Sequence, residues 1–147
     1  MANSNYPYRL LAVDVDGTLV TTRNELPDRN RQALHRAHEA GLKVCLCTGR
    51  SLTETREVLN RLNLNLDAGV FVFGAVVSDL REHRTIHRGQ IPAPLAHRLL
   101  AFFRQHECPI LMLFDVVKDG IDYRVLRGRK NLDAYDRWIE RSPATIE

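Results

Sequence analysis

The stretch Leu10-Leu11-Ala12-Val13-Asp14-Val15-Asp16-Gly17-Thr18-Leu19 decides the fold, because an apolar run ends there in two carboxylates and a glycine. Four consecutive apolar residues, 10–13, are typical of a strand buried on both faces, as in a parallel sheet. Asp14 and Asp16 alternate with Val15, so both carboxylates can leave the strand on one side. We therefore expect a strand that delivers two acids to the edge where α/β sheets place their ligands.

A second strand with the same design follows in the chain. Residues 28–40 are predicted to form a helix that Gly41 caps, and the apolar run 42–47 predicts a strand that ends at Thr48-Gly49-Arg50. Ser51 and Glu54 have the spacing of a capping box and predict a helix over 51–62. Strand, helix, strand, helix in this order favours an α/β fold with a Rossmann-like parallel sheet. The connection 19–27 is predicted to be solvated.

The rest of the chain has a different pattern. Residues 70–77 predict a third strand and a short fourth one, and the polar stretch 81–90 an edge strand or hairpin. Beyond it, the patterns predict a helix over 94–106, strands over 110–117 and 121–126 joined by an Asp119-Gly120 hairpin, and a helix over 131–141. We expect two units, an incomplete parallel-sheet core over 1–82 and part of an α+β domain over 83–147.

Composition excludes several classes of protein. Hydrophobic residues make up 44% of the 147 residues, enough for a core, and the formal net charge of +3 is too weak to indicate nucleic-acid binding. No apolar run is long enough to span a membrane, and no signal peptide is expected. Cys45, Cys47 and Cys108 are predicted to be reduced core thiols of a cytoplasmic protein. Aromatic residues at helical spacing, Phe102, Phe103 and Trp138, are predicted to lie in the core.

The two polar loops resemble the motifs of a known family. Asp14-x-Asp16-Gly17-Thr18-Leu19 is similar to the first motif of the haloacid dehalogenase-like hydrolases, and Thr48-Gly49-Arg50 to the second. The segment 70–79 resembles the strand-Asn-Gly-Ala-x-x-x-Asp segment of the Cof-like branch, which inserts an α/β cap domain between the second and third motifs. Residues 8–80 carry the specific part of the resemblance, and 81–147 resemble the first part of such a cap.

The resemblance implies a magnesium-dependent phosphatase acting on small phosphorylated metabolites of the sugar-phosphate type. Asp14 would be the nucleophile that forms an aspartyl-phosphate, Asp16 the general acid and base, and both would hold Mg²⁺. A carboxylate can accept a phosphoryl group only where a cation and hydrogen-bond donors offset the crowded negative charge. The residues expected to bind the substrate phosphate are Gly17, Thr18, Thr48, Gly49 and Arg50.

The sequence departs from the family pattern at two points. Phe73 stands where the Cof-like segment has Asn, and nothing after residue 80 resembles the lysine of the third motif or the Gly-Asp-x-x-x-Asp of the fourth. We therefore expect these 147 residues to be the amino-terminal part of such an enzyme, inactive by itself. Two other readings stay open: a catalytically dead module that binds phosphate or magnesium, and an interaction protein completed by association of copies through an exposed sheet edge.

Overall fold

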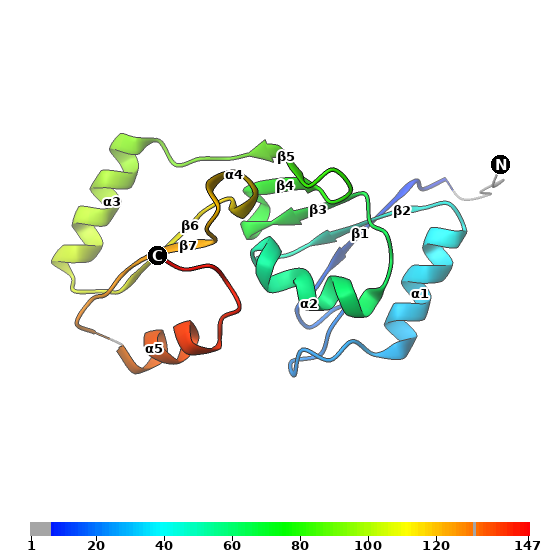
Figure 1. Ribbon diagram of the computed structural model, residues 1–147, viewed down its shortest axis with the longest axis horizontal. Helices are drawn as coiled ribbons and strands as arrows, with labels where there is room; N and C mark the ends of the chain where they lie inside the picture. Colours follow the sequence, from blue (N-terminus) through cyan, green and yellow to red (C-terminus); the bar gives the residue numbers. More distant parts are fainter. Residues whose placement is uncertain (1–6, 131) are drawn as a thin grey trace.

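The computed structural model describes residues 7–130 and 132–147, and its first part is a five-stranded mixed sheet (Figure 1). The strands lie in the order β1 (Leu10–Asp14), β2 (Lys43–Cys47), β3 (Ala68–Phe71), β4 (Val76–Asp79) and β5 (Arg84–Arg88). β1, β2 and β3 are parallel, whereas β3–β4 and β4–β5 are antiparallel. The predicted α/β class is confirmed, with a parallel sheet in its first three strands and an antiparallel extension.

Two helices supply the crossovers between the parallel strands. α1 (Asp28–Glu39) joins β1 to β2, and α2 (Leu52–Leu62) joins β2 to β3. Both begin and end within one residue of the predicted bounds, 28–40 and 51–62. Gly41 follows α1 with a φ of 90°, the left-handed conformation that glycine adopts without a steric cost. Apolar side chains from these helices, their strands and the connecting loops form the core: Val15, Leu19, Val20, Leu34, Val44, Leu46, Val58, Leu62 and Leu66.

The first strand differs from its prediction. β1 is an edge strand that pairs only with β2 within the described residues. Its side chains alternate between exposed and half-buried, because Leu11 and Val13 pack against the core whereas Leu10, on the other face, is 58% exposed. The prediction of burial on both faces is therefore wrong. The connection after it is also less solvated than predicted, because Leu19 and Val20 are buried. The backbone N–H of each bonds the Val15 carbonyl, which folds both side chains back into the core.

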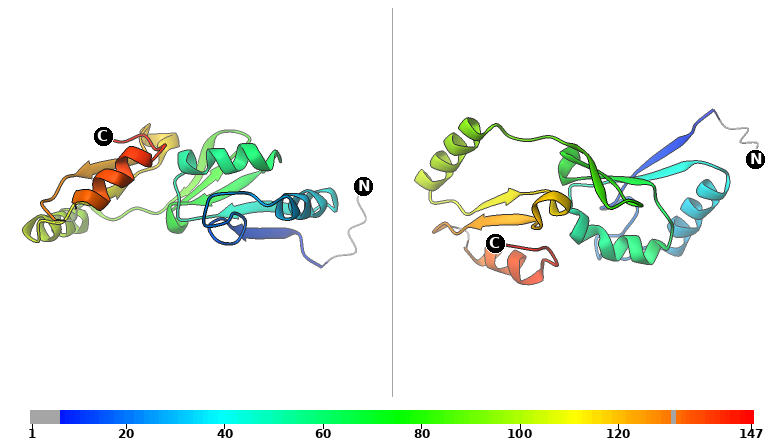
Figure 2. Two further views of the ribbon diagram at one scale, coloured as in Figure 1. Left: turned by 90° about the horizontal axis from the view of Figure 1, so that it is seen from below. Right: turned by 45° about the horizontal axis from the view of Figure 1, so that its top comes forward.

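The second part is a two-stranded antiparallel ribbon of β6 (Ile110–Leu113) and β7 (Tyr123–Leu126). α3 (Ala93–Gln105) and α5 (Leu132–Arg141) lie beside this ribbon, with α3 farther from the five-stranded sheet than α5 (Figures 1 and 2). Two polar contacts tie this part to the sheet: the Thr85 hydroxyl donates to the Asp115 carboxylate at 2.7 Å, and Arg88 pairs with Asp119 at 2.8 Å. The predicted boundary between two units at residue 82 stays a prediction.

Three predictions for this part are wrong. The strand expected over 110–117 ends at Leu113, because the Asp115 carboxylate accepts a hydrogen bond from the Val117 N–H and begins a short helix, α4 (Val116–Asp119). Asp119-Gly120 is therefore no hairpin turn, and Gly120 ends α4 with a φ of 77°. Phe102 and Phe103 lie outside the core, 54% and 39% exposed, because α3 has no buried residue.

Other residues match their predictions more closely. Trp138 is half-buried and meets the Tyr123 ring edge-on, with ring centroids 4.9 Å apart. Cys45, Cys47 and Cys108 are free thiols, each half-buried rather than fully within the core. No helix in the described part of the chain combines the length and the apolar character that crossing a membrane requires.

Candidate active site

The pairing of β1 with β2 places the two predicted loops side by side. Asp14 lies opposite Cys47 in the parallel register, so the loops that begin at Val15 and at Thr48 leave the same edge of the sheet. The carboxyl ends of neighbouring parallel strands are where α/β sheets bind ligands. The first loop carries Asp16, Gly17 and Thr18, all exposed, and the second carries the buried Thr48.

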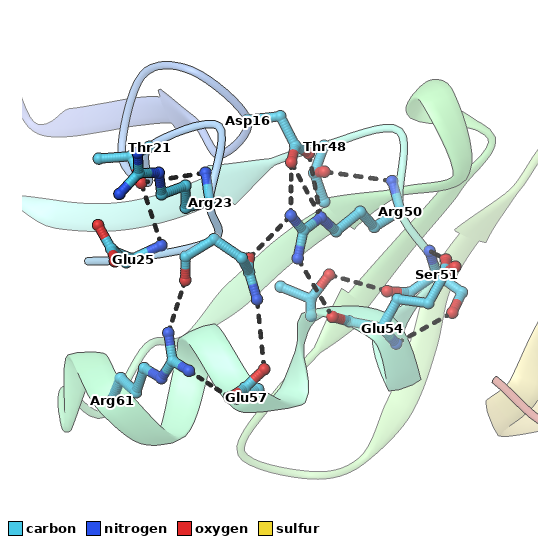
Figure 3. Close-up of polar contacts among 12 residues, drawn as sticks. Asp16, Thr21, Arg23, Glu25, Thr48, Arg50, Ser51, Glu54, Glu57 and Arg61 are labelled. Atoms are coloured by element: carbon cyan, nitrogen blue, oxygen red, sulfur yellow. Dashed lines mark hydrogen bonds and ion pairs between the residues drawn. The ribbon is translucent and has the colours of Figure 1, made fainter. Parts of the chain in front are cut away.

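A direct contact joins the two loops (Figure 3). The Arg50 Nε lies 3.2 and 3.1 Å from the two carboxylate oxygens of Asp16, and Nη2 lies 2.5 Å from Oδ1. Arg50 is 22% exposed at its side chain and Asp16 56%, so the pair lies at the surface. The Arg50 guanidinium thus contacts the carboxylate for which the resemblance implies the role of general acid and base, and the predicted binding of phosphate by Arg50 stays a prediction.

Thr48 and Gly17 use part of their hydrogen-bonding capacity within the loops. The Thr48 hydroxyl oxygen accepts from the Arg50 N–H at 3.2 Å, and Thr48 N–H donates to the Val70 carbonyl at 2.9 Å. The Gly17 N–H donates to the Val20 carbonyl at 3.0 Å, and its φ of 74° favours glycine. These bonds hold the loops in place. The Gly17 N–H is already used within its loop, whereas the hydrogen of the Thr48 hydroxyl can still be donated to a ligand.

Two asparagines that the sequence analysis did not assign to the site stabilise it. Asn24 accepts from Arg50 Nη2 at 2.9 Å through its side-chain oxygen and donates to Glu57 of α2 at 3.2 Å. Asn30, in the first turns of α1, donates to the carbonyls of Thr18 and Leu19 at 3.2 and 2.9 Å. An isolated polar residue in a loop or helix carries no local signal for such contacts, since their partners are distant in sequence.

The start of α2 links this edge to the second part of the molecule. The predicted capping box is present, with the Ser51 hydroxyl accepting from the Glu54 N–H at 3.2 Å and Glu54 accepting from the Ser51 N–H at 2.8 Å. The same Glu54 oxygen accepts from the Tyr123 hydroxyl of β7 at 2.8 Å. Burial raises the pKa of Tyr123 well above its usual range, and the bond to Glu54 adds to the rise.

Phe73, the departure from the Cof-like segment, lies at the same edge. It belongs to the turn Val72–Gly74, in which three successive residues have φ values of 53°, 54° and 92°. Positive φ is a genuine outlier for β-branched Val72 and uncommon for Phe73. The Phe73 side chain is 86% exposed, and its ring lies against Gly49. An aromatic ring thus covers the second loop where the family pattern has a small amide.

The residues at this edge could supply some of the oxygen ligands of a magnesium ion. Asp14 is exposed, and no ion pair among residues 7–130 and 132–147 involves it. Mg²⁺ binds through one or two protein oxygens and keeps water or phosphate oxygens at its other positions. The Asp14 carboxylate and the Asp16 backbone carbonyl match that requirement. Within the described residues, no group of three His, Cys, Asp or Glu side chains could hold a metal.

The sequence of the chain also matches a family of known proteins. Residues 11–123 match the family model described as haloacid dehalogenase-like hydrolase. This matched range includes both loops. The chain belongs to the haloacid dehalogenase-like hydrolases. The resemblance of the Asp14 and Thr48 motifs to this family is thereby confirmed.

Relatives of this haloacid dehalogenase-like chain include bacterial phosphatases. It is 26% identical over 136 residues to phosphatase YwpJ of Bacillus subtilis, covering 92% of this chain and 46% of that protein. It is 29% identical over 107 residues to the pyridoxal phosphate phosphatase YbhA of Escherichia coli, covering 73% and 39%. The chain therefore spans less than half the length of these two relatives.

Solved haloacid dehalogenase-like structures share the fold. All of this chain superposes on 52% of the phosphatase BT1666 of Bacteroides thetaiotaomicron, with a TM-score of 0.76 and 19% identity. A subclass IIB sugar phosphatase, BT4131, gives a TM-score of 0.68 at 24% identity, over 87% of this chain and 48% of that one. At these identities, the likeness supports the mixed sheet with its appended helices and ribbon.

Proposed function

We propose that this chain carries the phosphate-attacking half of the active site of a magnesium-dependent phosphatase that acts on small phosphorylated metabolites. The observation that carries the proposal is the parallel register of Asp14 with Cys47, because it brings Asp14, Asp16 and Thr48 to one sheet edge. Carboxylates beside a hydroxyl and backbone N–H groups suit phosphoryl transfer, in which positioning and electrostatics dominate. The sugar phosphatase among the structural neighbours makes sugar phosphates the first substrate class to test.

In this proposal Asp14 is the nucleophile, because no ion pair engages its carboxylate within the described residues. A carboxylate oxygen of Asp14 bonds to the phosphorus while the bond from phosphorus to the ester oxygen breaks. Asp16 delivers a proton to the departing oxygen, then takes one from the water that releases phosphate from Asp14. Since Arg50 occupies both oxygens of Asp16, it must turn away for this proton transfer.

Magnesium, when bound, would neutralise phosphate charge near Asp14. The chain's own contribution is to position the phosphate. The Thr48 hydroxyl donates to a phosphoryl oxygen, while Asn24 and Asn30 hold the loops in place. None of the three lysines of the chain lies beside Asp14. Lys43 pairs with Asp67 at 2.7 Å, and Lys118 and Lys130 belong to the part of the chain that follows the five-stranded sheet. We therefore expect the 147-residue chain to bind phosphate and Mg²⁺ but to turn over little.

The test combines binding with turnover. Melting temperature is measured with and without Mg²⁺ and inorganic phosphate, and hydrolysis of p-nitrophenyl phosphate is followed for the 147-residue chain. We expect a rise in melting temperature with both ligands, lost in Asp14→Asn and kept in Glu39→Gln, whose exposed carboxylate lies at the last residue of α1, at the end of the sheet opposite Asp14. No rise in the unmodified chain contradicts the proposal and favours an interaction protein.

A longer chain containing the same residues separates the enzyme from a dead binding module. If the proposal holds, such a chain hydrolyses p-nitrophenyl phosphate with Mg²⁺ and Asp14→Asn removes nearly all of that activity. Full activity of the Asp14→Asn variant rules out Asp14 as nucleophile. Binding without hydrolysis in the longer chain favours the module that only holds phosphate or magnesium.

A further inference from the structure

A cleft of about 840 Å³ lies between α2 and α5, beside the candidate active site. α2 and the loop before it supply one wall, and α5 with the two residues after it supplies the other. Arg50 lines the cleft at the end nearest Asp16, so the cleft adjoins the sheet edge without including Asp14 or Thr48. A volume of this size is typical of sites for small organic ligands.

The cleft is positively charged. Its lining includes four arginines, Arg50, Arg56, Arg137 and Arg141, and two glutamates, so two positive charges remain in excess. Both glutamates are engaged: Glu54 by Ser51 and Tyr123, and Glu57 by Arg61 and Asn24. No ion pair among the described residues engages Arg56, Arg137 or Arg141.

The two arginines on α5 are close neighbours of like charge. Arg137 and Arg141 are four residues apart on one helix, a spacing at which like charges repel. Arg56 of α2 lines the same cleft and adds a third positive charge. An anion between the helices would turn this repulsion into attraction, since guanidinium groups bind phosphate oxygens through paired N–H bonds.

An aromatic ring lies among these charges. Trp138, which lies between Arg137 and Arg141 in the sequence, also lines the cleft. Its ring packs edge-on against the ring of Tyr123. The Tyr123 hydroxyl is itself bonded to Glu54 at the start of α2. A fixed, half-buried indole offers a surface on which a planar ring can stack at a small cost in side-chain entropy.

We propose that the cleft between α2 and α5 binds a small organic phosphate that carries a planar ring. The arginines would hold the phosphate groups and Trp138 the ring. This site goes beyond the proposed hydrolysis, because its binding needs neither Asp14 nor magnesium. Arg50 connects the two sites: a ligand phosphate that draws Arg50 into the cleft releases the carboxylate of Asp16.

The test uses ADP as probe and the fluorescence of Trp138, the single tryptophan of the chain, as readout. We expect ADP to quench this fluorescence in a saturable manner. Removing two phosphate contacts in the double variant Arg137→Ala/Arg141→Ala should weaken ADP binding about tenfold or more. Arg56→Ala, on the opposite wall, should weaken it in the same direction, which covers the case that the double variant fails to fold. Arg104→Ala on α3 is the matched control and should bind as the unmodified chain does.

Further arms separate the parts of the proposal. Adenosine without phosphate and pyrophosphate without a ring should both bind more weakly than ADP, and added salt should weaken ADP binding. Asp14→Asn should bind ADP normally, so that failure of this site and failure of the phosphatase proposal are distinguishable. The inference is overturned if ADP leaves Trp138 fluorescence unchanged, if the arginine variants bind like the control, or if adenosine or pyrophosphate binds as tightly as ADP.

Discussion

The ring of Phe73 lies so close to Gly49 that a Cβ atom on this glycine would be 2.5 Å from Phe73 Cε1. The same relationship recurs in the neighbouring strand β3, where a Cβ on Gly69 would lie 2.5 Å from Phe71 Cζ. The two rings differ in freedom, because Phe73 is 86% exposed and Phe71 is fully buried. A methyl group added at Gly49 or at Gly69 would clash with a ring at the same distance, but only the exposed ring of Phe73 is free to move away.

Gly69→Ala should destabilise the protein, whereas Gly49→Ala should not. Phe71 cannot move without disturbing the core, so the added methyl group in Gly69→Ala should cost about 1–3 kcal/mol. Phe73 can turn into solvent, so Gly49→Ala should change the free energy of unfolding by less than about 0.5 kcal/mol. Urea denaturation of both variants measures the difference. Equal destabilisation would mean that Phe73 is held as firmly as Phe71.

Phe73→Asn should stabilise the fold. Phe73 has a φ of 54°, a left-handed conformation that asparagine adopts more readily than phenylalanine, so the substitution should add about 1 kcal/mol to the free energy of unfolding. The lost contact with Gly49 is small because Phe73 is exposed. The control, Phe102→Asn, removes an exposed phenylalanine from α3 and should not stabilise. A loss of stability in Phe73→Asn would show that ring packing outweighs backbone strain.

Arg50 and Asp16 should be energetically coupled. A double-mutant cycle with Arg50→Ala and Asp16→Ala should give a coupling energy of about 1 kcal/mol, because several charge-assisted bonds join the groups near the surface. The reference pair Arg61–Glu57, on the exposed face of α2, should couple by only about 0.3–0.5 kcal/mol. Both values should fall in high salt. Additive effects of the two Arg50 and Asp16 substitutions would contradict the contact.

The protein should lose stability at alkaline pH. Burial raises the pKa of the Cys45 thiol from 9.0 to about 11 and raises the pKa of Tyr123 further above its ordinary 10.0. A group whose pKa is higher in the folded state than in the unfolded state stabilises the folded protein. Its full contribution to the free energy of unfolding is present below the unfolded-state pKa and is lost as the pH rises through the folded-state pKa. The free energy of unfolding should therefore decrease above about pH 9.

Tyr123→Phe should reduce this alkaline decrease. At neutral pH, where tyrosine is protonated in both states, the variant should lose about 1–2 kcal/mol for its bond to Glu54. Tyr8→Phe, at a residue that is 72% exposed, should leave both the neutral value and the pH profile unchanged. Denaturation curves at a series of pH values test this. An unaltered profile in Tyr123→Phe would assign the alkaline loss to the thiol alone.

The sequence by itself determined the α/β class, the bounds of α1 and α2 to within one residue, the capping box at Ser51, and the two loops that follow Asp14 and Cys47. These features depend on local patterns, such as apolar runs, helical spacing and capping residues, whose physical causes lie within a few residues. The resemblance to the haloacid dehalogenase-like hydrolases rests on the same two short motifs, and the family match confirms it.

Only the tertiary structure decided what depends on distant neighbours. Burial of β1 depends on what covers each of its faces, and within the described residues Leu11 and Val13 pack against the core whereas Leu10, on the other face, is exposed. The bonds of Arg50 to Asp16 and of Tyr123 to Glu54 join residues 34 and 69 positions apart, so no local pattern predicts them. The α4 cap at Asp115 competes with strand propensity, and the buried carboxylate prevails because it also accepts from Thr85 of β5.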